Sequence, residues 1–267
     1  MLRARLATAA VAIPALLALI FLAPPWGWGL LVTVVAVLGL IEYLWLAFPG
    51  RARDRLLGLL LGATVIAAAV SAPAPGAILS AALSLLVAGG LTYVVVLRAD
   101  FERGLADLGL LAVGVLYTGL LLPHFYWLRR LTDGPQWVTF VIAIGMAGDS
   151  GGYFVGHALG RHKLIPRVSP GKTVEGALGI VLFSLVAGAA GKLILLPGHR
   201  WGEILALAFA MAVIGQLGDL GESVMKRTFG AKESGWIFPG HGGVLDRIDS
   251  LLFPVTLVYY YAVRVAP

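Results

Sequence analysis

Cysteine is absent from this sequence of 267 residues. The chain therefore forms no disulfide bonds and performs no thiol chemistry. Charged residues are scarce as well, at 13% of the chain, whereas soluble domains carry about a quarter. The sequence also lacks a His-Glu-x-x-His metal motif, a Gly-x-Ser-x-Gly nucleophile turn and a dinucleotide-binding glycine fingerprint. These absences argue against the enzyme classes that such motifs define, and the composition is not that of a soluble domain.

Apolar residues dominate what is present. The hydrophobic fraction is 59% and the mean hydropathy is +0.91. A helix needs about 20 apolar residues to cross a membrane. We therefore expect an all-α, polytopic transmembrane protein with about nine spans, or eight spans and a re-entrant segment if the short third one does not cross. The expected spans lie near residues 6–23, 27–48, 55–71, 76–97, 104–122, 136–158, 173–196, 202–221 and 247–265.

No soluble domain, long linker or internal repeat interrupts these spans, so we expect a single integral membrane domain. We divide it into scaffold helices, residues 1–135, and a catalytic transmembrane region with cytoplasmic loops, residues 136–267. Arg3 and Arg5 precede the first apolar run as in a signal peptide, but further spans follow at once, so we expect a retained anchor. Glu42 is the one acidic residue well inside a scaffold span, either as a satisfied interhelical hydrogen-bond acceptor or as a neighbour of the site.

The basic residues indicate an orientation. Lys and Arg outnumber Asp and Glu by 20 to 14, which in a polytopic protein reflects loop charge bias and not a nucleic-acid partner. With the N-terminus in the cytoplasm and nine alternating spans, fifteen basic residues fall inside and five outside, as the positive-inside rule requires. This orientation places both long polar loops, 159–172 and 222–246, in the cytoplasm, where a nucleotide would be found. The five outside are Arg129, Arg130, Lys192, Arg200 and Arg264.

Residues 223–249 form a polar, charged and glycine-rich segment between apolar spans. Charges placed where lipid begins are costly, so they indicate a reaction site. The segment resembles the signature of the phosphatidate cytidylyltransferases (CDP-diacylglycerol synthases). That signature reads Ser-x-apolar-Lys-Arg, four residues, Lys-Asp, then His-Gly-Gly-apolar-x-Asp-Arg-apolar-Asp. Every fixed position matches except one, because Glu233 stands where the family has Asp.

A second segment resembles the same family. It reads Asp149-Ser-Gly-Gly-Tyr and, further on, Ser169-Pro-Gly-Lys-Thr-Val-Glu-Gly. Gly171-Lys172-Thr173 is similar to the end of a P-loop, but Pro166 occupies the position of the first glycine, so we do not expect a P-loop. We expect this segment to open the seventh span, where a helix N-terminus attracts phosphate; the alternative is a helix cap with a snorkelling lysine.

Three acidic residues, Asp149, Asp219 and Asp246, fall at similar depth in three spans. They are either separate structural aspartates or part of a site for a divalent cation, which takes carboxylate oxygens together with substrate phosphates. Helical spacing puts Asp219 on one face with four neighbours, Gly215, Glu222, Ser223 and Lys226. It also puts Asp246, Asp249 and Ser250 on one face of the next helix.

The resemblance implies the reaction of CTP with phosphatidate to give CDP-diacylglycerol and pyrophosphate. It implies Mg²⁺, with a second ion such as K⁺ left open, and the metal ligands Asp219, Asp246, Asp249 and Asp149. Asp219, Asp246, Lys226 and Asp149 are the expected catalytic residues. Arg227 and Arg247 either pair with carboxylates or hold phosphate, and His241 ligates metal, binds phosphate or stabilises its loop. The residues expected to bind substrate are Ser169, Lys172, Thr173, Glu175, Ser223, Arg227, Lys232, His241, Gly242, Gly243 and Arg247.

The expected setting is the prokaryotic inner (plasma) membrane, with membrane lipids as neighbours, the site facing the cytoplasm and a homodimer left open. Two other functions stay open: a CTP-dependent enzyme acting on another membrane lipid phosphate or a polyprenol, and a secondary transporter. The transporter fits less well because the sequence shows no pair of matching halves. His157 and His162 are expected to be surface or capping residues.

Overall fold

The computed structural model describes residues 2–71, 75–235 and 242–265. Within these residues the chain forms long helices, one short helix and a two-stranded antiparallel hairpin. The elements in chain order are α1 (Leu2–Leu22), α2 (Pro25–Ala47), α3 (Ala52–Ser71), α4 (Pro75–Leu97), α5 (Phe101–Gly119), α6 (Pro123–Arg129), α7 (Gly134–Leu159), β1 (Lys163–Ile165), β2 (Ser169–Thr173), α8 (Val174–Ile194), α9 (Trp201–Thr228) and α10 (Leu245–Val265).

The length and apolar character of the helices confirm the expected all-α, polytopic membrane fold. Eight helices in the described part of the chain are long and apolar enough to cross a membrane. The helix α1 falls outside this set because its described apolar stretch, Ala12–Leu22, is shorter. The helix α3 belongs to the set as an uninterrupted helix of 20 residues, so the re-entrant alternative for the third segment is not needed.

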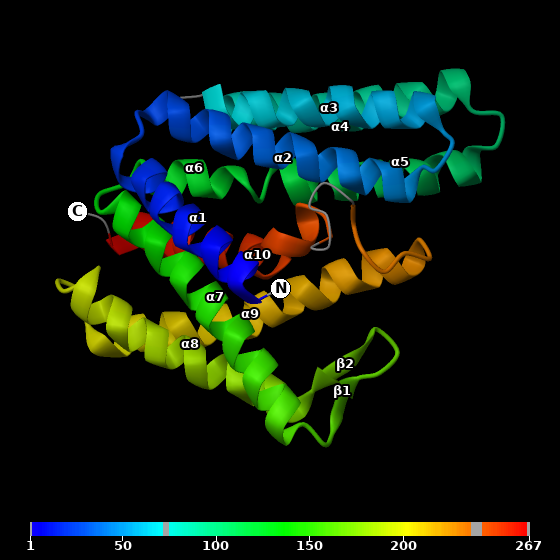
Figure 1. The fold of residues 1–267 in the computed structure, drawn as a ribbon. Helices are drawn as coiled ribbons and strands as arrows, with labels where there is room; N and C mark the ends of the chain where they lie inside the picture. Colours follow the sequence, from blue (N-terminus) through cyan, green and yellow to red (C-terminus); the bar gives the residue numbers. More distant parts are fainter. Residues whose placement is uncertain (1, 72–74, 236–241, 266–267) are drawn as a thin grey trace.

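The helices form two groups that share a central layer (Figure 1). Helices α2 to α5 pack on one another on one side, and α7 to α9 on the other, with α6 and α10 between them. Small residues set the helix spacing in the first group. A Cβ at Gly62 of α3 would overlap the Leu40 side chain of α2, and one at Gly114 of α5 would overlap the Tyr43 ring. Glycine thus permits the close contact of these helices.

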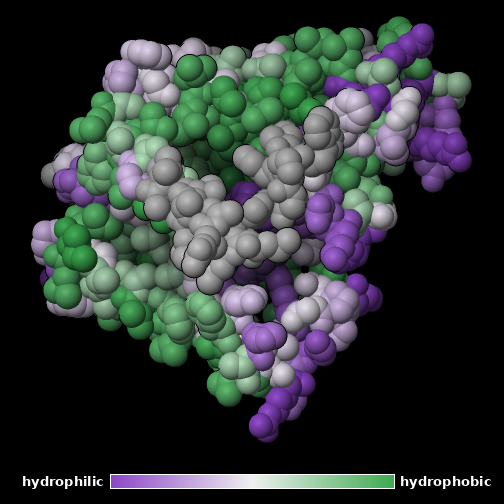
Figure 2. All heavy atoms as spheres, in the orientation of Figure 1, coloured by the Kyte–Doolittle hydropathy of each residue, from purple (hydrophilic) through white to green (hydrophobic). Residues whose placement is uncertain are grey.

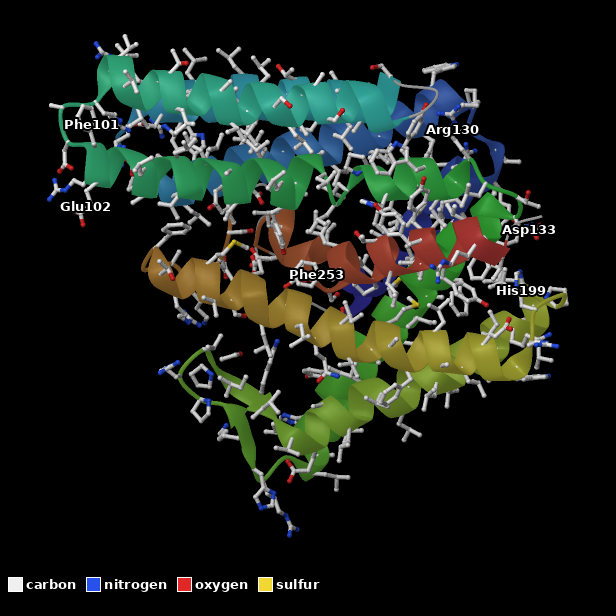
Figure 3. All side chains as sticks on the ribbon, turned by 180° about the vertical axis from the view of Figure 1, so that it is seen from behind. Phe101, Glu102, Arg130, Asp133, His199 and Phe253 are labelled. Atoms are coloured by element: carbon white, nitrogen blue, oxygen red, sulfur yellow. The ribbon has the colours of Figure 1, made fainter. Side chains whose placement is uncertain are left out.

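Four connections lie at the same end of the molecule. They are the α2–α3 turn, the α4–α5 turn, the β1–β2 hairpin and the segment after α9 (Figure 1). Hydrophilic residues gather over this end in the space-filling view, while hydrophobic residues cover the helices (Figure 2). Seen from behind, Phe101 and Glu102 lie at this end, and Arg130, Asp133 and His199 at the opposite one (Figure 3). The loops expected in the cytoplasm therefore share one face; its assignment to the cytoplasm stays a prediction.

Two expected boundaries were wrong. The eighth predicted span ends near residue 221, but α9 continues to Thr228, so the polar segment 222–228 is helical and the loop is shorter. Contact of Glu222 with Lys226, one turn later, stabilises this extension. Residues Ser169–Thr173 were expected to open a helix, but they form β2, which pairs with β1. The helix α8 starts one residue later, and the Thr173 hydroxyl caps it by accepting from the Gly176 N–H at 3.1 Å.

Candidate active site

The site begins with a close contact between α9 and α10. A Cβ on Gly218 would lie 2.6 Å from the backbone oxygen of Asp249, and one on Gly215 would lie 2.9 Å from that of Ser250. Only glycine allows the two backbones to approach this closely. The next turns of α9 therefore present Asp219 and Glu222 to the first turns of α10, as the helical spacing predicted.

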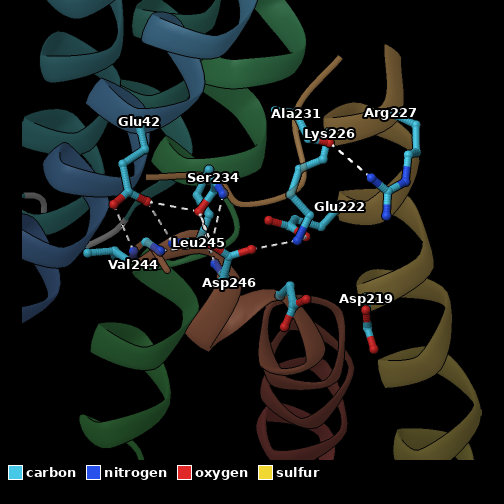
Figure 4. Close-up of polar contacts among 12 residues, drawn as sticks. Glu42, Asp219, Glu222, Lys226, Arg227, Ala231, Ser234, Val244, Leu245 and Asp246 are labelled. Atoms are coloured by element: carbon cyan, nitrogen blue, oxygen red, sulfur yellow. Dashed lines mark hydrogen bonds and ion pairs between the residues drawn. The ribbon is translucent and has the colours of Figure 1, made fainter. Parts of the chain in front are cut away.

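Asp246, in the first turn of α10, accepts hydrogen bonds from three donors on one oxygen. Its Oδ2 lies 2.8 Å from the backbone N–H of Ser234, 2.8 Å from the Ser234 hydroxyl and 2.8 Å from the Gly243 N–H. Gly242 has a φ of 75°, and a Cβ there would lie 2.6 Å from the same oxygen. The loop after α9 thus folds back to α10 and closes around this carboxylate (Figure 4).

Lys226 of α9 joins two carboxylates. Its Nζ lies 2.5 Å from Asp246 Oδ1 and also contacts Glu222 Oε2 on its own helix (Figure 4). All three side chains are shielded from solvent, with exposed fractions of 14% for Lys226, 13% for Asp246 and 1% for Glu222. The Glu222 Oε1 atom is buried without a hydrogen-bond partner among the described residues. A buried acceptor of this kind is costly unless an ion, a water molecule or a ligand satisfies it.

Glu42 reaches this site from α2 in the scaffold region. Its Oε1 accepts from the Val244 N–H at 2.8 Å, and its Oε2 accepts from the Leu245 N–H at 3.0 Å. The Ser234 hydroxyl lies 3.3 Å from the same Oε2. The sequence left open whether Glu42 is a satisfied hydrogen-bond acceptor or a neighbour of the site. In the structure it is both, because its acceptor oxygens bind the loop that surrounds Asp246 (Figure 4).

A cavity of about 410 Å³ opens beside this cluster. Asp219 and Lys172 line it together, and the Lys172 Nζ lies 2.6 Å from Asp219 Oδ2. Asp149 of α7 lines it as well and accepts from the Ser250 hydroxyl at 3.2 Å. The cavity is therefore bounded by α7, β2, α8 and α9. It contains the ion pair of Lys172 with Asp219, which is separate from the Lys226 cluster.

Four further side chains belong to the site although they were not assigned to it from the sequence. Tyr153, His157 and Gln216 line the cavity, and the rings of Tyr153 and His157 stack at 6.0 Å. Helical spacing from Asp149 and Asp219 is the signal that would have found them. Tyr117 of α5 packs its ring against Phe253 of α10, and its buried hydroxyl has no partner among the described residues. No sequence motif points to it.

The β1–β2 hairpin is held to the start of α8 by Glu175. The Glu175 Oε2 accepts from the N–H groups of Arg161 and His162 at 3.1 and 3.2 Å, and its Oε1 lies 2.6 Å from His162 Nδ1. Glu175 therefore orders the segment that carries Lys172. His157 and His162 are both exposed, as expected for surface residues, and His157 also lines the cavity.

The remaining predicted substrate residues lie around this centre. Arg227 donates to the carbonyl oxygens of Val168 in the hairpin turn, at 3.4 Å, and of Ala231, at 3.2 Å. It thus connects the end of α9 to the hairpin, which neither alternative from the sequence foresaw. Ser169 lies on β2, Ser223 on α9, Lys232 in the loop and Arg247 at the start of α10, whereas His241 lies outside the described residues.

The acidic side chains suit a cation in number and chemistry. Asp249 lies within electrostatic reach of Asp219, Glu222 and Asp149. Together with Asp246 these are five carboxylates, and the structure pairs two lysines with them. In the described residues no three acidic or histidine side chains converge closely enough to hold one ion. The excess of carboxylates and the unpartnered Glu222 oxygen are compatible with bound cations, and the metal stays a prediction.

Comparisons with known proteins identify relatives of this chain. A curated relative from Bacillus subtilis (strain 168), named phosphatidate cytidylyltransferase, is 37% identical over 171 residues, which is 64% of this chain and 63% of the relative. Relatives of the same name from Staphylococcus epidermidis and Staphylococcus aureus (strain COL) are 37% and 36% identical, over 63% of each chain. These matches span less than two thirds of the relatives' own length. The model of the cytidylyltransferase family, however, matches residues 3–265, and the chain therefore belongs to that family.

Proposed function

We propose that this protein transfers the cytidylyl group of CTP to phosphatidate, giving CDP-diacylglycerol and pyrophosphate. One observation carries the proposal most directly. The cavity that contains Lys172, Asp219 and Asp149 adjoins the Lys226 cluster at the polar end of a helical membrane protein. The name of the curated relatives supports the same substrates. A site at the end of the helices can meet a lipid phosphate at the membrane surface and a nucleotide from the aqueous phase.

The reaction does not need a strong general base. The phosphatidate phosphate is already anionic near neutral pH, so its oxygen is a competent nucleophile. This oxygen forms a bond to the α-phosphorus of CTP, the bond from that phosphorus to the bridging oxygen breaks, and pyrophosphate leaves with that electron pair. The barrier therefore comes from bringing two polyanions together and from the charge on the leaving group. Cationic groups aimed at phosphate oxygens lower both contributions.

The lysines perform this task in our proposal. Lys172 lines the cavity and pairs with Asp219 in the structure, so an entering triphosphate would replace Asp219 as the partner of its ammonium group. Asp219 would then be free to hold Mg²⁺ together with substrate phosphate oxygens, with Asp246 as the second principal ligand and Asp149 or Asp249 in support, as the sequence predicts. When bound, Mg²⁺ neutralises phosphate charge and stabilises the leaving pyrophosphate. A second ion such as K⁺ would find the remaining carboxylate at Glu222, whose buried Oε1 lacks a partner among the described residues.

We place the protein in the prokaryotic inner membrane with the polar end in the cytoplasm. The nine-span topology expected from the sequence puts fifteen of the 20 basic residues on the cytoplasmic side, and the hairpin and the segment after α9 lie at one end of the molecule. CTP and pyrophosphate would exchange with the cytoplasm, while phosphatidate and its product would stay in the bilayer.

The test is product formation by purified protein. In liposomes that contain phosphatidate, labelled CTP should give a CDP-lipid and release pyrophosphate only when a divalent ion is present. Omission of phosphatidate, CTP or the divalent ion should each abolish product. Folded protein that forms no CDP-lipid in detergent or in liposomes would contradict the proposal, and product from a polyprenol phosphate alone would point to another lipid substrate.

A further inference from the structure

The loop that carries Ser234 and Gly243 has a binding partner in the scaffold helices. Glu42 of α2 is 5% exposed, yet it is a carboxylate in the middle of an apolar helix. It accepts hydrogen bonds from the N–H groups of Val244 and Leu245, which have no partner within the helix because they lie at the N-terminus of α10. A carboxylate at a helix N-terminus also interacts favourably with the helix dipole.

The loop is complementary to this carboxylate. A Cβ on Gly235 or on Gly243 would overlap the Glu42 carboxylate oxygens, so the chain passes Glu42 with glycine on both sides of the loop. The Gly243 N–H, at the same time, donates to Asp246 Oδ2 at 2.8 Å. Ser234 lies between the two acids, with its hydroxyl 2.8 Å from Asp246 Oδ2 and 3.3 Å from Glu42 Oε2.

We infer that Glu42 is a positioning residue for the transferase site, which fixes the start of α10 and thereby the place of Asp246 opposite Lys226. The inference rests on the proposed function for its kinetic part. Among the described residues Glu42 neither lines the cavity nor contacts Lys226, so it acts through Val244, Leu245 and Ser234. The scaffold region, residues 1–135, then supplies one residue on which the geometry of the catalytic region depends.

The variant Glu42→Gln tests this anchor with minimal change in shape. It keeps one carbonyl oxygen but places an amide NH₂ against a backbone N–H, so one of the two α10 contacts is lost. Glu42→Asp keeps both acceptor oxygens on a shorter side chain and should recover part of the effect. The matched control is Leu40→Ala, on the same helix, because Leu40 is fully buried and packs on Gly62 of α3.

The first readout is hydrogen exchange of the amides of Val244 and Leu245 in the purified protein. Glu42→Gln should speed their exchange by about tenfold or more, as expected for the loss of a hydrogen bond to a charged group. Leu40→Ala should leave these two amides unchanged while it loosens the α2–α3 contact. This measurement does not depend on the reaction, so it stands even if no CDP-lipid forms.

The second readout is turnover of CTP per folded molecule. A small misplacement of a catalytic group costs up to about a hundredfold in rate, so kcat/KM should fall about ten- to a hundredfold in Glu42→Gln. It should recover partly in Glu42→Asp and stay near wild type in Leu40→Ala. Unchanged exchange at residues 244 and 245 would overturn the anchor, and faster exchange with normal turnover would overturn its positioning role. Wild-type protein without product would instead refute the proposed function alone.

Discussion

Lys226 should be the most sensitive single charge in the protein. Replacement by methionine keeps most of the apolar part of the side chain but leaves Glu222 and Asp246 without their shared cation. Loss of one partner of a buried ion pair costs about 3–5 kcal/mol. Asp246 keeps three other donors, so the lower end of this range applies. At about 2–4 °C per kcal/mol, the melting temperature should fall by about 6–12 °C.

Thermal unfolding in detergent measures this effect, and a second substitution checks its cause. Glu222 is 1% exposed and has no partner other than Lys226 among the described residues, so it carries most of the unpaired charge. Adding Glu222→Gln to Lys226→Met should therefore restore part of the lost stability. Lys163→Met is the control, because Lys163 is exposed on β1. If Lys226→Met melts within about 2 °C of wild type, like a surface substitution, or if the double variant is less stable than Lys226→Met, the argument is wrong.

Three further predictions concern the site and its orientation. Asp219→Asn and Asp246→Asn should each remove nearly all Mg²⁺-dependent turnover. The double variant should be scarcely less active than either single one, because the effects of residues that act as a unit are non-additive. Near-normal turnover in either single variant would reject the assignment of these two metal ligands. Gly218→Ala should lower the free energy of unfolding by about 1–3 kcal/mol and reduce turnover, because the added Cβ would lie 2.6 Å from a backbone oxygen of α10. An unchanged melting temperature with unchanged kinetics would show that α9 and α10 can move apart at no cost. Cysteines can be introduced at positions 161 and 232, because the chain has none of its own. Neither should react with an impermeant thiol reagent added outside intact cells. Labelling of either cysteine would contradict the predicted cytoplasmic position of these loops.

The linear pattern of the chain was enough to predict the helices and the identity of the main acidic residues. The nine apolar runs correspond to the long helices α1 to α5 and α7 to α10 of the described residues, because each helix satisfies its own backbone hydrogen bonds and needs only apolar length. The spacing of Asp219, Glu222 and Lys226 likewise predicted one shared face, since helical neighbours lie three and four residues apart. In the structure Lys226 contacts both Glu222 and Asp246 at the start of α10, whereas Asp219 pairs with Lys172 of β2.

The sequence could not determine which charges neutralise one another. Lys172 was expected to bind substrate and Lys226 to be catalytic, and both roles stay predictions. What the sequence did not reveal is that they pair with Asp219 and Asp246, about 50 and 20 residues away. Periodicity describes a single helix and carries no information about distances between elements. The hairpin was missed for a related reason, because β2 exists only through its pairing with β1.

The sequence by itself thus determined the membrane class, the helices and the family motifs, all of which depend on composition or local spacing. Only the tertiary structure decided that Glu42 belongs to the site. Glu42 and Leu245 are separated by 203 residues, and their contact exists because the scaffold group and the α7–α10 group pack around a shared central layer. A single acidic residue in an apolar helix has many possible partners, and the packing of whole helices selects the two backbone N–H groups that it binds.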